Sequence, residues 1–162
     1  MATKWPEAVE RVAAFLRDSR AEARLEEFPE GTPTARDAAR AVGCEPSAIV
    51  KSLVFLCDGQ PVVVLVPGDR RADPGKVASA VGARKAKVAG AADVELATGF
   101  EPGAVAPFPL PRVRDVLIDH TLLAQTIVWV GGGSPRHMAG VAPAELVRLA
   151  RARPMDAVQD GA

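Results

Sequence analysis

The sequence predicts a mixed α/β (α+β) fold, in which a largely antiparallel sheet is surrounded by helices. The clearest sign is a pair of apolar stretches, residues 49–57 and 61–66, separated by Asp58-Gly59, a pair typical of a β-hairpin turn. Helical spacing of apolar residues occurs in other parts of the chain and alternates irregularly with the strands. The length and the absence of repeats indicate a single domain over residues 1–162.

Two helices with a strand between them are expected in the N-terminal part. Residues 6–22 carry apolar side chains at helical spacing, and a proline suits the first turn of that helix. Residues 24–28 follow as a short strand. The second helix starts at Thr34, whose hydroxyl can cap it together with Asp37 three residues on, and Gly43 ends it.

The middle of the chain contains the hairpin and then two short helices. Residues 62–66 are apolar without interruption, which predicts a strand that is buried on both faces. Asp73-Pro74 opens a helix that runs through Val81, and residues 92–98 form another helix.

The C-terminal part returns to strands. In order, we expect Gly- and Pro-rich turns over residues 99–111, strands over 113–119 and 125–130, a sharp loop at 131–133, a short strand over 137–141 and a helix over 143–151. The core of the domain should therefore extend over about residues 26–151. The tail over residues 154–162 should be frayed.

The composition is that of an ordinary folded protein. The chain is 48% apolar and 25% charged, and its formal net charge of zero argues against a broad surface for duplex nucleic acid. Cys44 and Cys57 make neither a disulfide framework nor a metal-ligand cluster, so no structural zinc is expected. The N-terminus lacks an apolar signal core, and the longest apolar run is too short for a bilayer. We expect a cytoplasmic protein with no membrane contact, and a monomer by default.

Basic residues are denser between positions 70 and 87 than elsewhere. Two interpretations are open: the charges form one basic face that holds an RNA end, or they are solvated surface charges, which is the commoner case. The residues are Arg70, Arg71, Lys76, Arg84, Lys85 and Lys87, followed later by Arg112 and Arg114.

Lys51 lies inside the apolar stretch of the first hairpin strand. Strand alternation places Lys51 and Leu53 on one face and Val50 and Ser52 on the other. The ammonium could point into a cleft and bind a phosphate or an anionic intermediate. The alternative is a solvent-facing or edge-strand lysine that discourages aggregation, and the bare sequence favours this alternative because lysine is rarely buried.

Three successive glycines, Gly131-Gly132-Gly133, follow directly after a predicted strand. Their backbone N–H groups could form an oxyanion hole, or the glycines could serve a tight turn that needs positive φ. Neither GxGxxG nor GK[ST] is present, so the loop is not a nucleotide fingerprint. Ser134 and His137 follow without a GxSxG elbow. A serine nucleophile is therefore a weak hypothesis, and His137 is better suited to orienting the substrate or binding a terminal ribose.

Five segments in order resemble the YbaK / prolyl-tRNA synthetase-associated editing domain family. The most specific is the loop TGFEPGAVAPF at residues 98–108, which fits a TGxxxGxxxPF pattern. The others are the lysine-bearing strand at 49–55, a Gly- and Lys-rich helix end at 80–87, a strand end at 116–119 and the glycine loop through 131–137. Each segment is weak alone, but five in this order make a chance match improbable. The resemblance extends from about Glu26 to Leu149.

The resemblance implies a central, barrel-like and mostly antiparallel sheet surrounded by helices. It also implies hydrolysis of the ester that joins an incorrect amino acid to the 3′-terminal adenosine of a tRNA, without a metal or cofactor. Lys51 matches the essential lysine of the family, and the loops at 103–107 and 131–133 match its pocket walls. On this basis we assign catalysis to Lys51, Gly131, Gly132 and Gly133, and substrate binding to Thr34, Gly103, Ala104, Pro107, Phe108, Asp119, Ser134 and His137.

We therefore expect a freestanding trans-editing aminoacyl-tRNA deacylase whose partner is the 3′ end of a mischarged tRNA. An aminoacyl ester is already reactive, so a positioned water and backbone oxyanion donors can suffice, with Lys51 as a substrate-positioning cation. An aminoacyl-tRNA synthetase could be a second partner that supplies tRNA affinity. Two alternatives remain: a noncatalytic tRNA- or synthetase-binding regulator of the same fold, and a small-molecule ester hydrolase.

Overall fold

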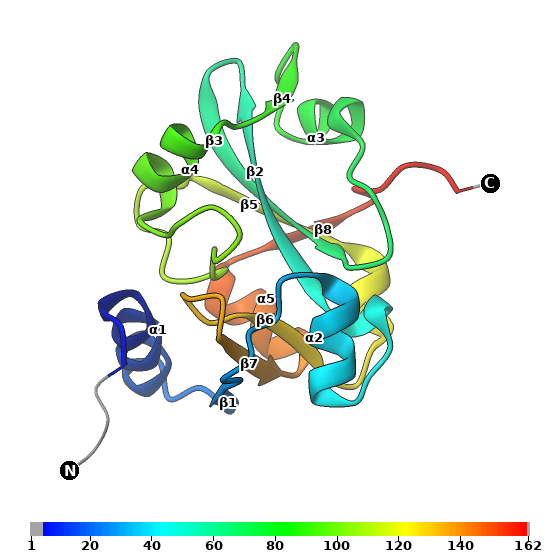
Figure 1. The fold of residues 1–162 in the computed structure, drawn as a ribbon. Coiled ribbons are helices and arrows are strands. Elements are labelled where there is room, and N and C mark those ends of the chain that lie inside the picture. The colour runs from blue at the N-terminus through cyan, green and yellow to red at the C-terminus, as the bar shows by residue number, and fades with distance from the viewer. Residues whose placement is uncertain (1–4, 162) are drawn as a thin grey trace.

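The computed structural model describes residues 5–161, which form two β-sheets with helices on their outer sides (Figure 1). The α-helices are α1 (Glu7–Asp18), α2 (Ala35–Val42), α3 (Pro74–Ala80), α4 (Ala91–Thr98) and α5 (Pro143–Ala150). The strands are β1 (Ala23–Glu27), β2 (Val50–Cys57), β3 (Gln60–Pro67), β4 (Ala86–Val88), β5 (Asp115–Asp119), β6 (Val128–Gly131), β7 (His137–Val141) and β8 (Arg153–Met155). Two 3₁₀ turns, η1 (Pro46–Ala48) and η2 (His120–Ala124), complete the elements.

The strands are divided between a three-stranded and a five-stranded sheet. The first has the order β1-β7-β6 and is antiparallel throughout. The second has the order β4-β2-β3-β5-β8, in which β4, β2 and β3 are antiparallel whereas β3, β5 and β8 are parallel. A bridge between Ile49 and Trp129 joins the start of β2 to β6. The mixed, mostly antiparallel fold is confirmed, but the sheet is not a closed barrel, because β4 and β8 end the larger sheet as edges.

The helix boundaries follow the predicted capping signals. Thr34 Oγ1 accepts the Asp37 N–H at 3.0 Å, and Gly43 ends α2 with a φ of 77°. Asp73 Oδ1 accepts the N–H groups of Gly75 and Lys76 at the start of α3. None of the helices within residues 5–161 has the length and hydropathy needed to cross a bilayer.

The hairpin of β2 and β3 is the long central element of Figure 1. Asp58 and Gly59 have φ values of 48° and 83°, as a two-residue hairpin turn requires. As predicted, β3 is buried on both faces: Val63 and Leu65 pack on one side, whereas Val62 and Val64 pack on the other.

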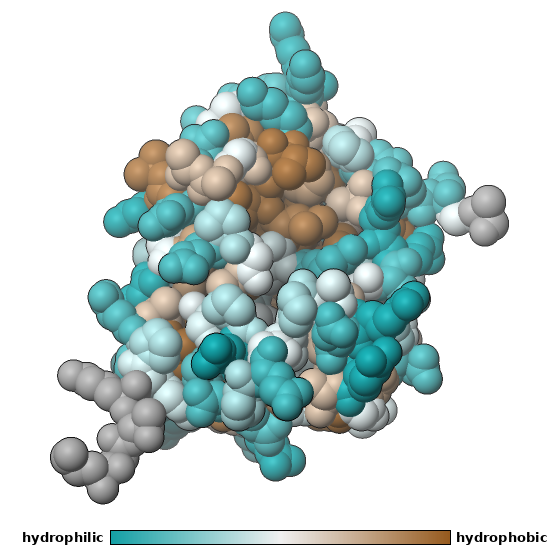
Figure 2. Space-filling model, viewed as in Figure 1, coloured by the Kyte–Doolittle hydropathy of each residue, from teal (hydrophilic) through white to brown (hydrophobic). Residues whose placement is uncertain are grey.

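A central apolar core fills the space between the two sheets. Val54 and Leu65 of the larger sheet meet Val130 and Val141 of the smaller one, and α1 and α5 close the ends. The opposite face of the larger sheet packs against α3. That face is incompletely covered, and Figure 2 shows an apolar area there; Leu53, Val81, Ala83 and Ala86 are partly buried residues of this cluster.

The C-terminal tail is ordered, so the predicted fraying after Pro154 is wrong. Strand β8 pairs with β5. Ala157 is fully buried and its N–H donates to Asp119 Oδ1 at 2.8 Å, while the Gln159 N–H donates to Arg71 O at 2.8 Å. A strand of three residues that includes a proline has no alternating pattern to reveal it. The tail therefore belongs to the folded domain.

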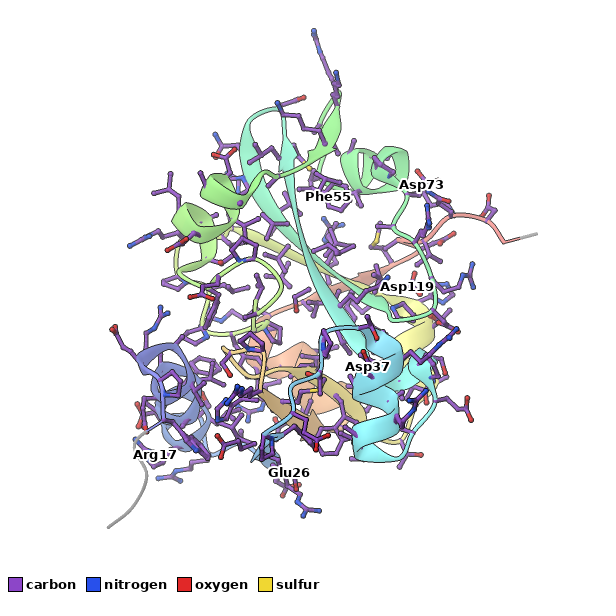
Figure 3. All side chains as sticks on the ribbon, in the orientation of Figure 1. Arg17, Glu26, Asp37, Phe55, Asp73 and Asp119 are labelled. Carbon is purple, nitrogen blue, oxygen red and sulfur yellow. The ribbon has the colours of Figure 1, made fainter. Side chains whose placement is uncertain are left out.

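Replacing Asp119 should loosen this tail. Asp119 is labelled in Figure 3. Its buried carboxylate accepts the N–H groups of Thr121 and Ala157 and the Thr121 hydroxyl, and Asp119→Ala removes all three bonds. We expect the free energy of unfolding to fall by about 1–3 kcal/mol in urea denaturation. The exposed Asp18 is the matched control, and Asp18→Ala should change stability by less than about 0.5 kcal/mol. Equal stability of both variants would contradict a structural role for Asp119.

Candidate active site

A short stretch of unpaired edge on β2 marks the candidate site. One edge of β2 pairs with β3 along its whole length. The other edge pairs with β4 only over Phe55–Cys57, and next to that the Ala89 N–H donates to Val54 O at 3.0 Å. Residues two apart in a strand point their backbone groups to the same edge, so Ser52 points its N–H and C=O away from β3. Within residues 5–161 no strand pairs with β2 there, because β6 meets it only at Ile49.

A pocket of about 350 Å³ opens over this gap. It is bounded by the start of α2, the β2 edge, the loop after α4 and the loop between β6 and β7, which are far apart in the sequence. Of the residues that the sequence assigned to the site, the pocket brings together Thr34, Lys51, Gly103, Ala104, Gly131, Ser134 and His137.

Lys51 is half-buried at the pocket, and its ammonium is held by the backbone. Its Nζ donates to Arg70 O at 3.0 Å. Burial and then the positive charge of Arg71 lower the pKa of Lys51, while the charge of Asp69 acts in the opposite direction. The predicted alternation is confirmed, because Val50 packs in the central core and Leu53 on the opposite face. An ammonium with three donors keeps N–H groups for an anion beyond the one bond to Arg70.

The two glycine-containing loops touch each other at the pocket. A Cβ on Gly131 would lie 2.6 Å from Val105 O, so only glycine permits this approach. The Ala104 N–H donates to Glu101 O at 3.0 Å, whereas the Val105 N–H has no acceptor within the described chain. Val105 also lines the pocket. Its N–H is therefore a candidate oxyanion donor.

Gly132 and Gly133 serve the turn and not the pocket. The Gly132 N–H donates to His137 O at 2.8 Å, so it is not available to an ester oxygen. Gly133 has a φ of 101°, and a Cβ there would lie 2.9 Å from the backbone of Ala8 in α1. These contacts favour the tight-turn interpretation of both glycines, and neither lines the pocket, so their catalytic assignment stays a prediction.

His137 is buried in the pocket wall, with 2% of its surface exposed. Its Nδ1 lies 2.5 Å from Ser134 Oγ, and its ring meets Trp5 edge-on. Nε2 has no hydrogen-bond partner among the described residues and lies 3.8 Å from Glu27 Oε2. Burial lowers the pKa of His137 and Glu27 partly opposes this, so the ring is neutral near pH 7. Ser134 Oγ also accepts the Arg136 N–H at 3.0 Å, which ties this hydroxyl into the turn.

Three other predicted binding residues lie outside the pocket. Phe108 is a core residue that stacks on Phe15 at 5.4 Å between ring centroids. Pro107 borders a separate cavity next to Phe15. The oxygens of Asp119 are taken by its own chain, as described above. The structure therefore does not bring these three residues to the pocket, and their role in substrate binding stays a prediction.

Ser52 lines the pocket but was not predicted as a site residue, whereas Val105 lines it as part of the 103–107 loop that the resemblance assigned to the pocket wall. Ser52 Oγ is buried and has no hydrogen-bond partner in the described chain. The position of Ser52 next to Lys51 in the strand was a signal that could have identified Ser52 as a site residue. The sequence did not single out Val105 within that loop, because Val105 contributes through its backbone, which no side-chain pattern reveals.

One group outside the pocket has the spacing of metal ligands. Single ligand atoms of Asp119, His120 and Asp156 lie within 4.8 Å of one another. However, backbone N–H groups occupy the Asp119 oxygens, and Lys76 Nζ donates to Asp156 at 2.9 Å. This group therefore does not offer a free set of oxygen and nitrogen ligands.

The fold and pocket together define an editing-type domain, and the sequence comparison gives its family. Residues 29–149 match the model of the aminoacyl-tRNA editing domain. The chain therefore belongs to the aminoacyl-tRNA editing domain family.

Similar curated proteins are proline–tRNA ligases. That of Maridesulfovibrio salexigens is 33% identical over 104 residues, which are 64% of this chain and 18% of the ligase. That of Bacillus pumilus is 30% identical over 129 residues, which are 79% of this chain and 23% of the ligase. The chain thus spans about a fifth of the length of these relatives.

Solved structures with the same fold match nearly the whole chain. A protein described as a proposed trans-editing enzyme for prolyl-tRNA synthetase is 34% identical with a TM-score of 0.88, covering 98% of this chain and 100% of that one. The hypothetical protein APE2540 is 29% identical with a TM-score of 0.86, covering 92% and 99%.

A side chain at Gly131 should separate the two loops. For Gly131→Ala we expect the free energy of unfolding to fall by about 1–3 kcal/mol, because the methyl group overlaps Val105 O. Deacylation should fall by up to about 10²-fold if the displaced Val105 N–H is an oxyanion donor. Gly90 is the control, because it has negative φ and open space around a Cβ. If Gly131→Ala and Gly90→Ala have the same free energy of unfolding and the same deacylation rate, the close approach of Gly131 to Val105 is not needed for stability or activity.

Proposed function

We propose that the protein is a trans-editing deacylase that hydrolyses the ester of a mischarged tRNA. The observation that carries this proposal is the convergence of Lys51, the free edge of β2 and the Val105 loop in one pocket, in a chain of the editing-domain family. The similar structure described as a proposed trans-editing enzyme supports a domain that acts apart from a synthetase. The proline–tRNA ligase relatives support tRNA charged by that synthetase as the substrate.

The aminoacyl ester occupies the pocket, with the terminal ribose at its mouth. Lys51 binds the phosphate of the terminal nucleotide and holds the ester in place. The Val105 N–H, together with the N–H of Ser52 at the strand edge, faces the carbonyl oxygen and stabilises the negative charge that develops there. Buried donors suit this task because they need no reorganisation during the reaction.

Water is the nucleophile. Its oxygen attacks the carbonyl carbon, the bond to the ribose oxygen breaks, and that oxygen takes a proton. The products are a free amino acid and a tRNA with a restored hydroxyl. Ser134 is a poor nucleophile because its hydroxyl is tied to His137 and to the Arg136 N–H. The neutral His137 orients the substrate from the pocket wall.

A synthetase partner would supply tRNA affinity that a chain of zero net charge lacks. The ligase relatives make prolyl-tRNA synthetase the first partner to test. A cytoplasmic location agrees with this function and stays a prediction.

The direct test is a panel of mischarged tRNAs, each labelled in the amino acid. We expect the wild type to release at least one amino acid. Lys51→Met keeps the aliphatic stem and removes the charge, and it should lower kcat/KM by roughly 10- to 150-fold, the equivalent of one hydrogen bond to a charged group at about 1.5–3 kcal/mol. Its urea midpoint should change little, because removal of a half-buried charge offsets the loss of the hydrogen bond to Arg70 O.

Other results would favour the alternatives. Binding of tRNA without release of any amino acid would indicate a regulator. Release from small aminoacyl esters alone would indicate a small-molecule hydrolase. Full activity of Lys51→Met on every substrate would show that Lys51 has no role in substrate binding or hydrolysis.

A further inference from the structure

The loop that holds Lys51 is fastened by the C-terminal tail. Lys51 Nζ donates to Arg70 O, in a loop that precedes α3. The tail binds this loop at several points: the Gln159 N–H donates to Arg71 O at 2.8 Å, Arg70 donates to Gln159 O at 2.9 Å, and Ala72 bridges to Val158. The tail residues Val158 and Gln159 lie outside the 29–149 segment that matches the family model, whereas the loop residues lie within it. The tail thus fixes Arg71 in the chain next to the Lys51 ammonium.

The two arginines of this loop differ in what they bind. Arg70 uses its guanidinium on Gln159 O. Arg71 is exposed, and its guanidinium has no hydrogen-bond or ion-pair partner among residues 5–161. Its charge is nonetheless close enough to Lys51 to act on the lysine, and the opposing influence of Asp69 is the smaller one.

Two cations held together without a bridging carboxylate are unfavourable unless an anion binds between them. Of the nearby carboxylates, Asp156 and Asp160 both pair with Lys76, and Asp69 in the same loop offsets the neighbouring positive charge only in part. Arg71 does not line the pocket itself, whereas Lys51 does. The Lys51 ammonium is bonded to Arg70 O, so the backbone of Arg71 follows directly on the side of Lys51 that faces away from the lining. A phosphate bound by both side chains would sit there while its nucleoside and ester reach into the pocket.

We propose that Arg71 is a second phosphate-binding residue, and that Lys51 and Arg71 together hold the phosphodiester on the 5′ side of the substrate's terminal adenosine. This proposal rests on the proposed function. Guanidinium and ammonium donors are the groups that proteins use for phosphate oxygens, and both keep unused N–H groups here. The C-terminal tail holds this pair of cations in place, because it fixes the loop that carries Arg71.

The test compares two substrates and three variants. One substrate is a mischarged tRNA, and the other is the same amino acid esterified to adenosine, which has no phosphate. Because Arg71 is exposed, its contact should contribute no more than an ordinary hydrogen bond, so for Arg71→Ala we expect KM for the tRNA to rise about 3- to 10-fold with kcat nearly unchanged. On the adenosine ester the variant should equal the wild type. Arg71→Lys should recover most of the loss, and Arg17→Ala, an exposed arginine at the far end of α1 (Figure 3), should change neither KM.

An equilibrium measurement separates this inference from the proposed hydrolysis. Binding of an uncharged RNA ending in CCA is followed at increasing salt, where each phosphate contact contributes about 0.7 to the slope of log K against log salt. We expect Arg71→Ala to reduce the slope by about that amount and Arg17→Ala to leave it unchanged. Two results would overturn the phosphate role of Arg71. One is a salt slope that Arg71→Ala leaves unchanged, and the other is a rise in KM for the adenosine ester equal to the rise for the tRNA. If no amino acid is released at all but the slope still falls, the hydrolysis is wrong and the phosphate site stands.

Discussion

The unpaired edge of β2 between its contacts with β4 and β6 is the constraint on which the site depends. β3 pairs with β2 along its full length. On the other side β4 is too short, and β6 forms a bridge only at Ile49, just before β2 begins. The backbone of Ser52 is therefore left without a strand partner, although unpaired buried backbone groups are costly. A ligand can satisfy them, and the pocket lies over this gap. The same strand presents Lys51 at the rim, so one element supplies both backbone donors and a cation.

The site relies on positioned backbone donors and a cation more than on reactive side chains. Gly131 allows the Val105 loop to approach β6, and Val105 keeps a free N–H beside the pocket. This arrangement suits an ester that is already activated, because positioning and oxyanion stabilisation can then supply most of the rate. It also explains why the tail matters, since it holds the loop to which the Lys51 ammonium is bonded.

Local chemistry made part of this structure predictable from the sequence. The Asp-Gly turn, the uninterrupted apolar run of β3 and the Thr34 cap each act within a few residues, and all three were confirmed. Long-range contacts were not predictable. Strands β4 and β8 have three residues each, too few for a periodic signal, and their partners decide that they are strands. Three identical glycines proved to have different roles, because only their neighbours distinguish Gly131 at Val105, Gly132 in a bonded turn and Gly133 against α1.

The most direct measurement is the location of a bound substrate analogue. An aminoacyl-adenosine in which an amide replaces the ester cannot be hydrolysed readily, and its binding can be followed by backbone ¹⁵N chemical shifts of the whole protein. We expect the largest changes at Ser52, Val105 and Gly131, and small changes at Phe108 and Asp119. Changes concentrated around the cavity beside Phe15, with Ser52 and Val105 unaffected, would contradict the assignment of the site to the free edge of β2.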